Sequence, residues 1–121
     1  MDYSQWVSVQ REDGETVGYL DPCDPDYNQV IPRNILGHAV TEGCEYLTGE
    51  ELLLERGIRE VMDTWVLDDG SAERTEVLSI VEVSPQGIVL ANALRTKALQ
   101  PTERIHVSWP DIARRLTISH G

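Results

Sequence analysis

The sequence predicts an α+β protein, mainly antiparallel β, that folds as a single β-rich domain over residues 1–121. Short segments of alternating apolar and polar residues recur along the chain, and turn-forming residues separate several of them at hairpin spacing. Only one segment has a clear helical pattern, so crossover helices for a parallel sheet are missing. We therefore expect six to eight short strands in a curled sheet or partly open barrel, with one short helix covering it.

The first predicted pair of strands is a β-hairpin formed by residues 6–12 and 15–20. Apolar and polar side chains alternate in the first segment, as expected for a strand with one buried face. Asp13-Gly14 lies between the two segments, and this dipeptide favours the positive φ angles of a tight hairpin turn. The local sequence therefore predicts both the strands and their connection.

A loop and two short strands are expected next. Residues 21–28 contain two prolines, which remove backbone donors and disfavour regular strand pairing, so this segment predicts a loop. Residues 29–31 and 35–41 are short strand candidates, and Pro32 separates them.

The one predicted helix covers residues 49–56. Thr48 and Glu51 have the spacing of a capping box, in which each side chain bonds to a backbone N–H at the start of the helix. Gly57 suits the left-handed conformation that follows a last helical turn. Apolar residues keep helical spacing beyond Gly57, so a helix that continues through it is the alternative, at a cost of about 1 kcal/mol.

The second half of the chain predicts further strands and one helical turn. Turns are expected at Asp69-Gly70 and at residues 84–87, where glycine and proline occur together. The strand candidates, which are rich in β-branched and aromatic residues, are 62–67, 74–83, 88–94 and 104–109, and residues 111–116 are expected to form one or two helical turns.

The charge of the chain is strongly negative and unevenly distributed. Its 21 acidic and 10 basic residues give a formal net charge of −11, and residues 1–60 hold 13 of the acids and 4 of the bases. Such a charge repels nucleic-acid phosphates and anionic lipid, so we expect neither nucleic acid nor a membrane as a partner. The charge is explained either by solubility or by an acidic surface for a basic partner protein. The candidates for that surface are Asp21, Asp24, Asp26, Glu42, Glu45, Glu50 and Glu51.

No part of the chain reads as a targeting or membrane-spanning segment. The longest uninterrupted apolar run, at residues 88–91, is four residues long, far shorter than a membrane span. The first residues lack the basic start and apolar stretch of a secretory signal. We therefore expect a soluble, cytoplasmic protein.

The cysteines and histidines give little support to a metal site or a nucleophile. Cys23 and Cys44 lack the paired spacing of a zinc site, and nothing in the sequence orients His38 as a base for Cys44. No glycine-rich phosphate loop or serine-nucleophile motif occurs. We expect no catalytic residues, no metal and no cofactor, and an enzyme is the minority hypothesis.

One loop has the beginning of a calcium-site pattern. Asp24, Asp26 and Asn28 alternate as the first ligands of an EF-hand loop do, but Gln29 and Ile35 stand where that loop requires glycine and glutamate. A solvated loop stiffened by proline is the preferred interpretation, and a non-standard calcium site is the alternative.

The large aromatic side chains fall in predicted strands, in a chain without phenylalanine. Filling the core is their expected role. Tyr19, Trp65 and Trp109 are the candidates to line a pocket or an interface instead, because aromatic residues are enriched at both.

A set of hairpin and core residues carries a family resemblance. They are Trp6, Val7, Val9, Arg11, Asp13, Gly14, Val17, Gly18, Tyr19, Leu20 and Pro22, followed by Leu36-Gly37 and Val81-Glu82-Val83-Ser84. With these residues the chain resembles small, acidic, uncharacterised proteins of actinobacteria. The resemblance implies a bacterial, cytoplasmic setting and no activity.

Three hypotheses about function arise from the sequence. The first is a non-enzymatic domain whose acidic half binds another protein, one of basic charge in the sharpest version. The second is a small-ligand-binding protein or enzyme that uses a pocket in the curled sheet. The third is a homodimer formed through an exposed edge strand.

Overall fold

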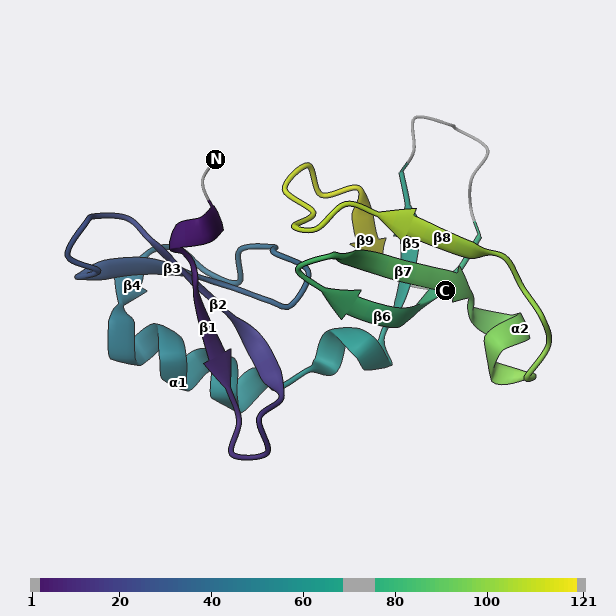
Figure 1. The fold of residues 1–121 in the computed structure, drawn as a ribbon, viewed down its shortest axis with the longest axis horizontal. Helices are drawn as coiled ribbons and strands as arrows, with labels where there is room; N and C mark the ends of the chain where they lie inside the picture. Colours follow the sequence, from purple (N-terminus) through teal and green to yellow (C-terminus); the bar gives the residue numbers. More distant parts are fainter. Residues whose placement is uncertain (1–2, 69–75, 120–121) are drawn as a thin grey trace. The chain divides into compact units, whose positions relative to one another are not determined.

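The computed structural model describes residues 3–68 and 76–119 of the 121-residue chain (Figure 1). Its strands form two antiparallel sheets, one of four strands and one of five, and neither closes into a barrel. The predicted α+β class is confirmed, although the described residues hold nine strands in two sheets instead of six to eight in one curled sheet. The chain divides into two compact units, unit 1 (Met1–Ile58) and unit 2 (Arg59–Gly121), and the single domain stays a prediction.

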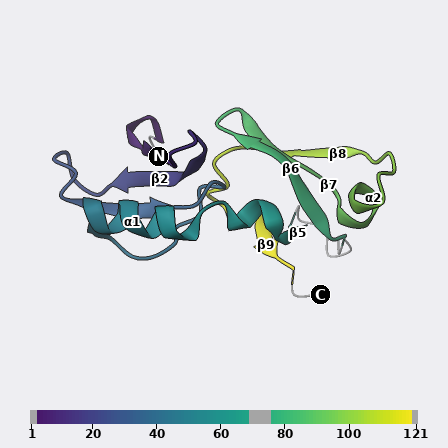
Figure 2. The same cartoon turned by 90° about the horizontal axis from the view of Figure 1, so that it is seen from below.

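Unit 1 is a four-stranded antiparallel meander with one helix packed against it. The strands lie in chain order, and α1 contacts all four of them. Figure 2 shows α1 running along one face of this sheet. The elements are the 3-10 turn η1 (Tyr3–Gln5), β1 (Val7–Gln10), β2 (Thr16–Pro22), β3 (Gln29–Arg33), β4 (Cys44–Glu45) and α1 (Tyr46–Arg56).

The predicted hairpin is confirmed as β1 and β2. The two strands are antiparallel, with Val7 opposite Leu20 and Val9 opposite Gly18. Gly14 adopts a φ of +85°, which is the left-handed conformation expected from its place in the turn.

The strand predicted at residues 35–41 is wrong. Pro32 does not end the preceding strand, because β3 continues through it to Arg33. The chain then turns instead of forming a strand, because the Asn34 side-chain oxygen accepts hydrogen bonds from the backbone N–H groups of Leu36 (2.9 Å) and His38 (3.1 Å). Such a local acceptor competes with strand pairing, and the chain after β3 forms an isolated bridge, between Arg33 and Ala39, in place of a strand.

Helix α1 begins earlier than predicted and ends where expected. It starts at Tyr46, directly after β4, so Thr48 lies inside the first turn and the predicted capping box is wrong. The pairing of β4 with β3 is a long-range contact, and it places the start of the helix at this point. Gly57 has a φ of +65° and donates its N–H to the Leu53 carbonyl, so the helix ends at Arg56 as the sequence predicts.

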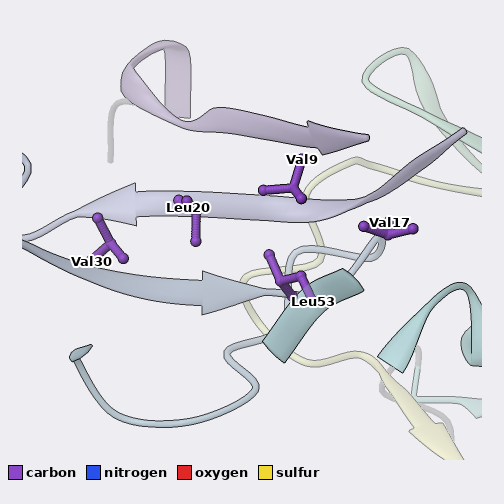
Figure 3. Close-up of a cluster of buried hydrophobic side chains, with 5 residues drawn as sticks. All are labelled: Val9, Val17, Leu20, Val30 and Leu53. Carbon is purple, nitrogen blue, oxygen red and sulfur yellow. The ribbon is translucent and has the colours of Figure 1, made fainter. Parts of the chain in front are cut away.

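The core of unit 1 lies between the sheet and α1. Val9, Val17, Leu20, Val30 and Leu53 form one buried cluster, with Leu53 coming from the helix (Figure 3). Full burial of side chains of this size contributes about 1.5–3 kcal/mol each relative to exposure. This cluster therefore holds the helix against the strands.

Two glycines allow the close approach of α1 to the sheet. A Cβ atom at Gly18 would clash with the Arg33 carbonyl oxygen and would lie 2.9 Å from Leu53 Cδ2. A Cβ atom at Gly49, on the helix, would lie 2.9 Å from Leu20 Cδ2. A side chain at Gly18 would therefore disturb the pairing of β2 with β3 as well as the contact with Leu53, and one at Gly49 would require the Leu20 side chain to move.

Unit 2 contains the five-stranded sheet, in the spatial order β8-β7-β6-β5-β9. Its buried side chains include Leu78, Ile88, Leu90, Val107 and Leu116. The elements are the 3-10 turn η2 (Arg59–Met62), β5 (Thr64–Leu67), β6 (Leu78–Ser84), β7 (Gly87–Asn92), α2 (Ala93–Lys97), β8 (Arg104–Val107) and β9 (Leu116–Ile118).

The strands predicted for the second half of the chain are confirmed as β5 to β8, with ends shifted by a few residues. The short helix α2 was not expected, and it follows β7 because the Asn92 side chain caps it by accepting the Arg95 N–H at 2.9 Å. The turn expected at Asp69-Gly70 and the first residues of the strand expected over 74–83 lie outside the described residues.

The helical turns predicted at residues 111–116 are replaced by a loop and by strand β9. The carboxylate of the buried Asp111 accepts the backbone N–H groups of Arg115 and Leu116, each at 3.0 Å. These bonds close the loop and lead the chain into β9, which pairs with β5. Among the described residues, no helix has the length and apolar character needed to cross a membrane.

Candidate functional site

Most of the negative charge of the chain belongs to unit 1, which contains all seven acids of the predicted interaction surface. Unit 1 has 12 acidic and 3 basic residues, a net charge of −9, while unit 2 has 9 acidic and 7 basic residues, a net charge of −2. The structure shows how many of these acids already have partners within the unit.

Asp21 is engaged in an ion pair. Its Oδ2 atom lies 2.9 Å from the terminal nitrogen of Arg33 and 3.0 Å from its Nε, and the side chains are 17% and 12% exposed, respectively. The Arg33 guanidinium also stacks over the Trp6 ring, 4.7 Å from the ring centroid. Asp21 therefore neutralises a neighbouring cation, and its charge does not add to an exposed acidic surface.

Asp24 closes its own loop. Its carboxylate accepts three backbone N–H groups, from Asp26 at 3.0 Å, Asn28 at 3.1 Å and Gln29 at 3.2 Å. This bonding is a structural role for the residue that began the calcium-like pattern. Asp26 lies exposed in the same loop.

The other four predicted acids lie in one continuous stretch of chain, from the turn before β4 into α1. Glu42, Glu45 and Glu51 are exposed, and Glu50 is partly exposed. Within the described part of the chain these four side chains make no ion pair. The structure thus leaves them available to a partner.

The outer face of α1 adds residues that the sequence analysis missed. Leu47 and Leu54 are 67% and 41% exposed, although Leu53 on the inner side of the same helix is buried. Residues seven apart lie on the same side of an α-helix, so the two exposed leucines are aligned. Glu55 also lies exposed on this helix. Helical spacing could have revealed the alignment, had the helix start been placed at Tyr46.

The three aromatic candidates have different environments. Trp65 is buried in unit 2, and its indole N–H donates to the Glu60 carbonyl at 3.0 Å, so it is a core residue. Tyr19 in unit 1 is partly buried, 6.2 Å from the Trp6 ring, and this burial raises the pKa of its hydroxyl. Trp109 in unit 2 is partly buried.

Two adjoining grooves lie beside α2 in unit 2, with volumes of about 510 Å³ and 270 Å³. Thr102 lines both, Arg95 lines the larger and Arg104 the smaller. The larger groove is bordered mainly by polar side chains, including Glu76 and Glu103. The aromatic candidates do not line these grooves, which the sequence analysis did not foresee.

The Cys44 thiol is poorly suited to nucleophilic chemistry. Burial raises the pKa of the Cys44 thiol, and the neighbouring Cys23 and Glu45 raise it further. A raised pKa keeps a thiol protonated at neutral pH, whereas the thiolate is the nucleophile. Among residues 3–68 and 76–119, no three His, Cys, Asp or Glu side chains are grouped in a way that could hold a metal ion.

No family model, curated protein or solved structure matches the chain. The resemblance to small actinobacterial proteins therefore stays a prediction, and the function is argued from the residues themselves.

Proposed function

We propose that this chain is a non-enzymatic interaction domain whose acidic unit 1 binds a basic partner protein. The observation that carries the proposal is the concentration of exposed, unpaired acids between residue 42 and the end of α1, in a unit of net charge −9. Complementary charge raises association rates and discriminates against acidic partners, and it needs no catalytic group.

The salt dependence of partner capture tests this proposal. The immobilised chain should retain basic proteins from a native cell lysate at about 50 mM salt. It should release most of them at about 300 mM, because salt screens the attraction between exposed charges. The double variant Glu42→Gln/Glu51→Gln should retain at least about fivefold less of these proteins at low salt. Its matched control is Glu82→Gln/Glu103→Gln, which removes two exposed acids from unit 2 and should behave as the wild type. Empty capture at both salt concentrations would contradict the proposal.

Small-ligand binding is a second candidate function, supported by the grooves beside α2. The larger groove, of about 510 Å³, falls within the size range of small-molecule sites. A metabolite panel screened by thermal shift tests this function, because a ligand at 100 times its Kd stabilises a protein by about 2.7 kcal/mol. A panel that leaves the Tm unchanged would count against it.

A homodimer through an edge strand is the third candidate. Within the described sheets β1 and β4 lie at the edges of one sheet, and β8 and β9 at the edges of the other. Edge strands expose backbone groups that can pair with a second copy. Light scattering over a wide concentration range tests this, and a strict monomer excludes it.

A further inference from the structure

The outer face of α1 combines exposed apolar and acidic side chains in a regular pattern. Each residue of an α-helix is rotated by about 100° from the previous one, so Leu47 and Leu54 differ by only about 20°. By the same geometry Glu51 and Glu55 project to one side of this pair, at about 40° and 80° from Leu47, and Glu50 projects to the other side, at about 60°. The face is therefore an apolar stripe with an acidic border.

This stripe is not part of the core of unit 1. Gly49 and Leu53 lie on the opposite side of the helix, and they are the residues of α1 that are buried. Isolated exposed leucines are common on protein surfaces, but two that align along one helix form a contact stripe. Exposures of 67% for Leu47 and 41% for Leu54 leave both side chains accessible to a partner.

Charge decides which partner suits this face. The single basic residue of α1, Arg56, projects about 180° from Leu47, so the border of the stripe is entirely acidic. A second copy of α1 would bring three glutamates against three glutamates, and anionic lipid would also be repelled. A helix with apolar side chains along one face and lysine or arginine beside them would complement both the leucines and the glutamates.

We infer that the outer face of α1, formed by Leu47, Leu54, Glu50, Glu51 and Glu55, is the docking surface for an amphipathic basic helix of a partner protein. This inference rests on the proposed function and specifies its surface and the chemistry of its partner. The leucines select the spacing of the partner's apolar side chains, and the glutamates select its charge.

Two synthetic peptides of about 14 residues provide the probe, a length that allows roughly four helical turns. One has leucine at helical spacing and lysine at the other positions, and the second has the same composition in scrambled order. Fluorescence anisotropy with the full chain should give a Kd for the patterned peptide about tenfold below that for the scrambled one, because only the patterned helix can place its leucines against the stripe.

The leucine variants separate the stripe from general charge attraction. Leu47→Ser/Leu54→Ser should raise the Kd of the patterned peptide to that of the scrambled peptide. The matched control is Leu94→Ser/Leu99→Ser, since these unit 2 leucines are 78% and 92% exposed, and it should bind as the wild type. Circular dichroism should show all variants folded, because the replaced side chains are largely outside the core.

A third variant, Glu50→Gln/Glu51→Gln/Glu55→Gln, keeps the leucines and removes the acidic border. It should raise the Kd for the patterned peptide about threefold or more and weaken its salt dependence. Equal affinity for the two peptides, or no effect of the Leu47 and Leu54 changes, would overturn the assignment of this surface. In that case salt-dependent capture of basic proteins would still support the proposed function, whereas failure of both peptides and of capture would contradict both.

Discussion

The two units of the chain are alike in construction and different in charge. Each is an antiparallel sheet with buried leucine and valine, and in each an aspartate carboxylate ties down a loop, Asp24 in unit 1 and Asp111 in unit 2. Yet unit 1 has a net charge of −9 and unit 2 a net charge of −2. Similar sheets can thus have very different surfaces, because core packing leaves exposed positions unconstrained.

The comparison also shows that an acidic residue is not always a free charge. Asp21 is paired with Arg33, and Asp24 accepts three backbone N–H groups, so both serve the structure of unit 1. The acids of the 42–55 stretch have no such role among the described residues. Only the exposed acids of the 42–55 stretch are therefore available for the charge-driven interaction that we propose.

The largest expected effect comes from the contact between α1 and its sheet. Leu53→Ala removes a buried side chain of unit 1 and should destabilise the protein by about 2–5 kcal/mol, because it leaves a cavity. Leu54→Ala, one residue along and on the exposed side, should cost less than about 1 kcal/mol. Chemical denaturation of both variants measures the difference, and equal losses would show that the outer face of α1 is part of the core.

The same variant tests whether the two units fold together. If the chain is a single domain, as the sequence predicts, Leu53→Ala should increase amide hydrogen exchange in both units by the same factor. Increased exchange confined to residues 3–58 would show that unit 1 unfolds separately.

An intermediate effect is expected at the loop of unit 2. Asp111→Ala leaves the backbone N–H groups of Arg115 and Leu116 without their acceptor, which should cost about 1–3 kcal/mol. Asp26→Ala removes an exposed acid from unit 1 and should change the stability by less than about 0.5 kcal/mol. Thermal unfolding compares the two variants, and an unchanged Tm for Asp111→Ala would show that its bonds add nothing.

The smallest effect is expected at the hairpin turn of unit 1. The Asp13 carboxylate accepts the Glu15 N–H at 2.9 Å, and this bond, assisted by the charge of Arg11, lowers the pKa of Asp13 below 3.8. Because the folded pKa is lowered, the stabilising contribution is present above the ordinary pKa and is lost as the pH falls through the folded pKa. The Tm of the wild type should therefore fall slightly below about pH 4 through the protonation of Asp13. Asp13→Asn, which cannot ionise, should not show this part of the fall. An NMR titration that gives Asp13 a pKa at or above 3.8 would contradict the prediction.

The parts of the fold that the sequence predicted are those that neighbouring residues determine. Asp13-Gly14 predicted the turn of the first hairpin, and Gly57 predicted the end of α1, because both act through local backbone geometry. Strands β5 to β8 of unit 2 were predicted for the same reason, since each segment is by itself rich in β-branched and aromatic residues.

The errors arise where a distant strand pairing or a side-chain hydrogen bond overrides the local backbone preference. The helix was predicted to start at residue 49, but α1 starts at Tyr46, directly after β4, because β4 pairs with the distant strand β3. Residues 35–41 are β-prone but form a loop, because the Asn34 side chain accepts hydrogen bonds from the N–H groups of Leu36 and His38. Composition alone does not reveal these bonds.

Part of the candidate site was missed for the same reason. The sequence pointed to Glu50 and Glu51, but with the helix start misplaced, Leu47 lay outside the predicted helix and its alignment with Leu54 was not apparent. Side-chain partners such as Arg33 for Asp21 also depend on strand register, which composition does not reveal.

The close approach of α1 to the sheet at Gly18 and Gly49 has a consequence for recognising homologues of this chain. Substitutions of surface acids leave the core unchanged, but a methyl group at Gly18 would meet the Arg33 carbonyl oxygen and Leu53, and one at Gly49 would meet Leu20. Homologues that keep this helix-on-sheet contact should therefore retain both glycines while their charges diverge.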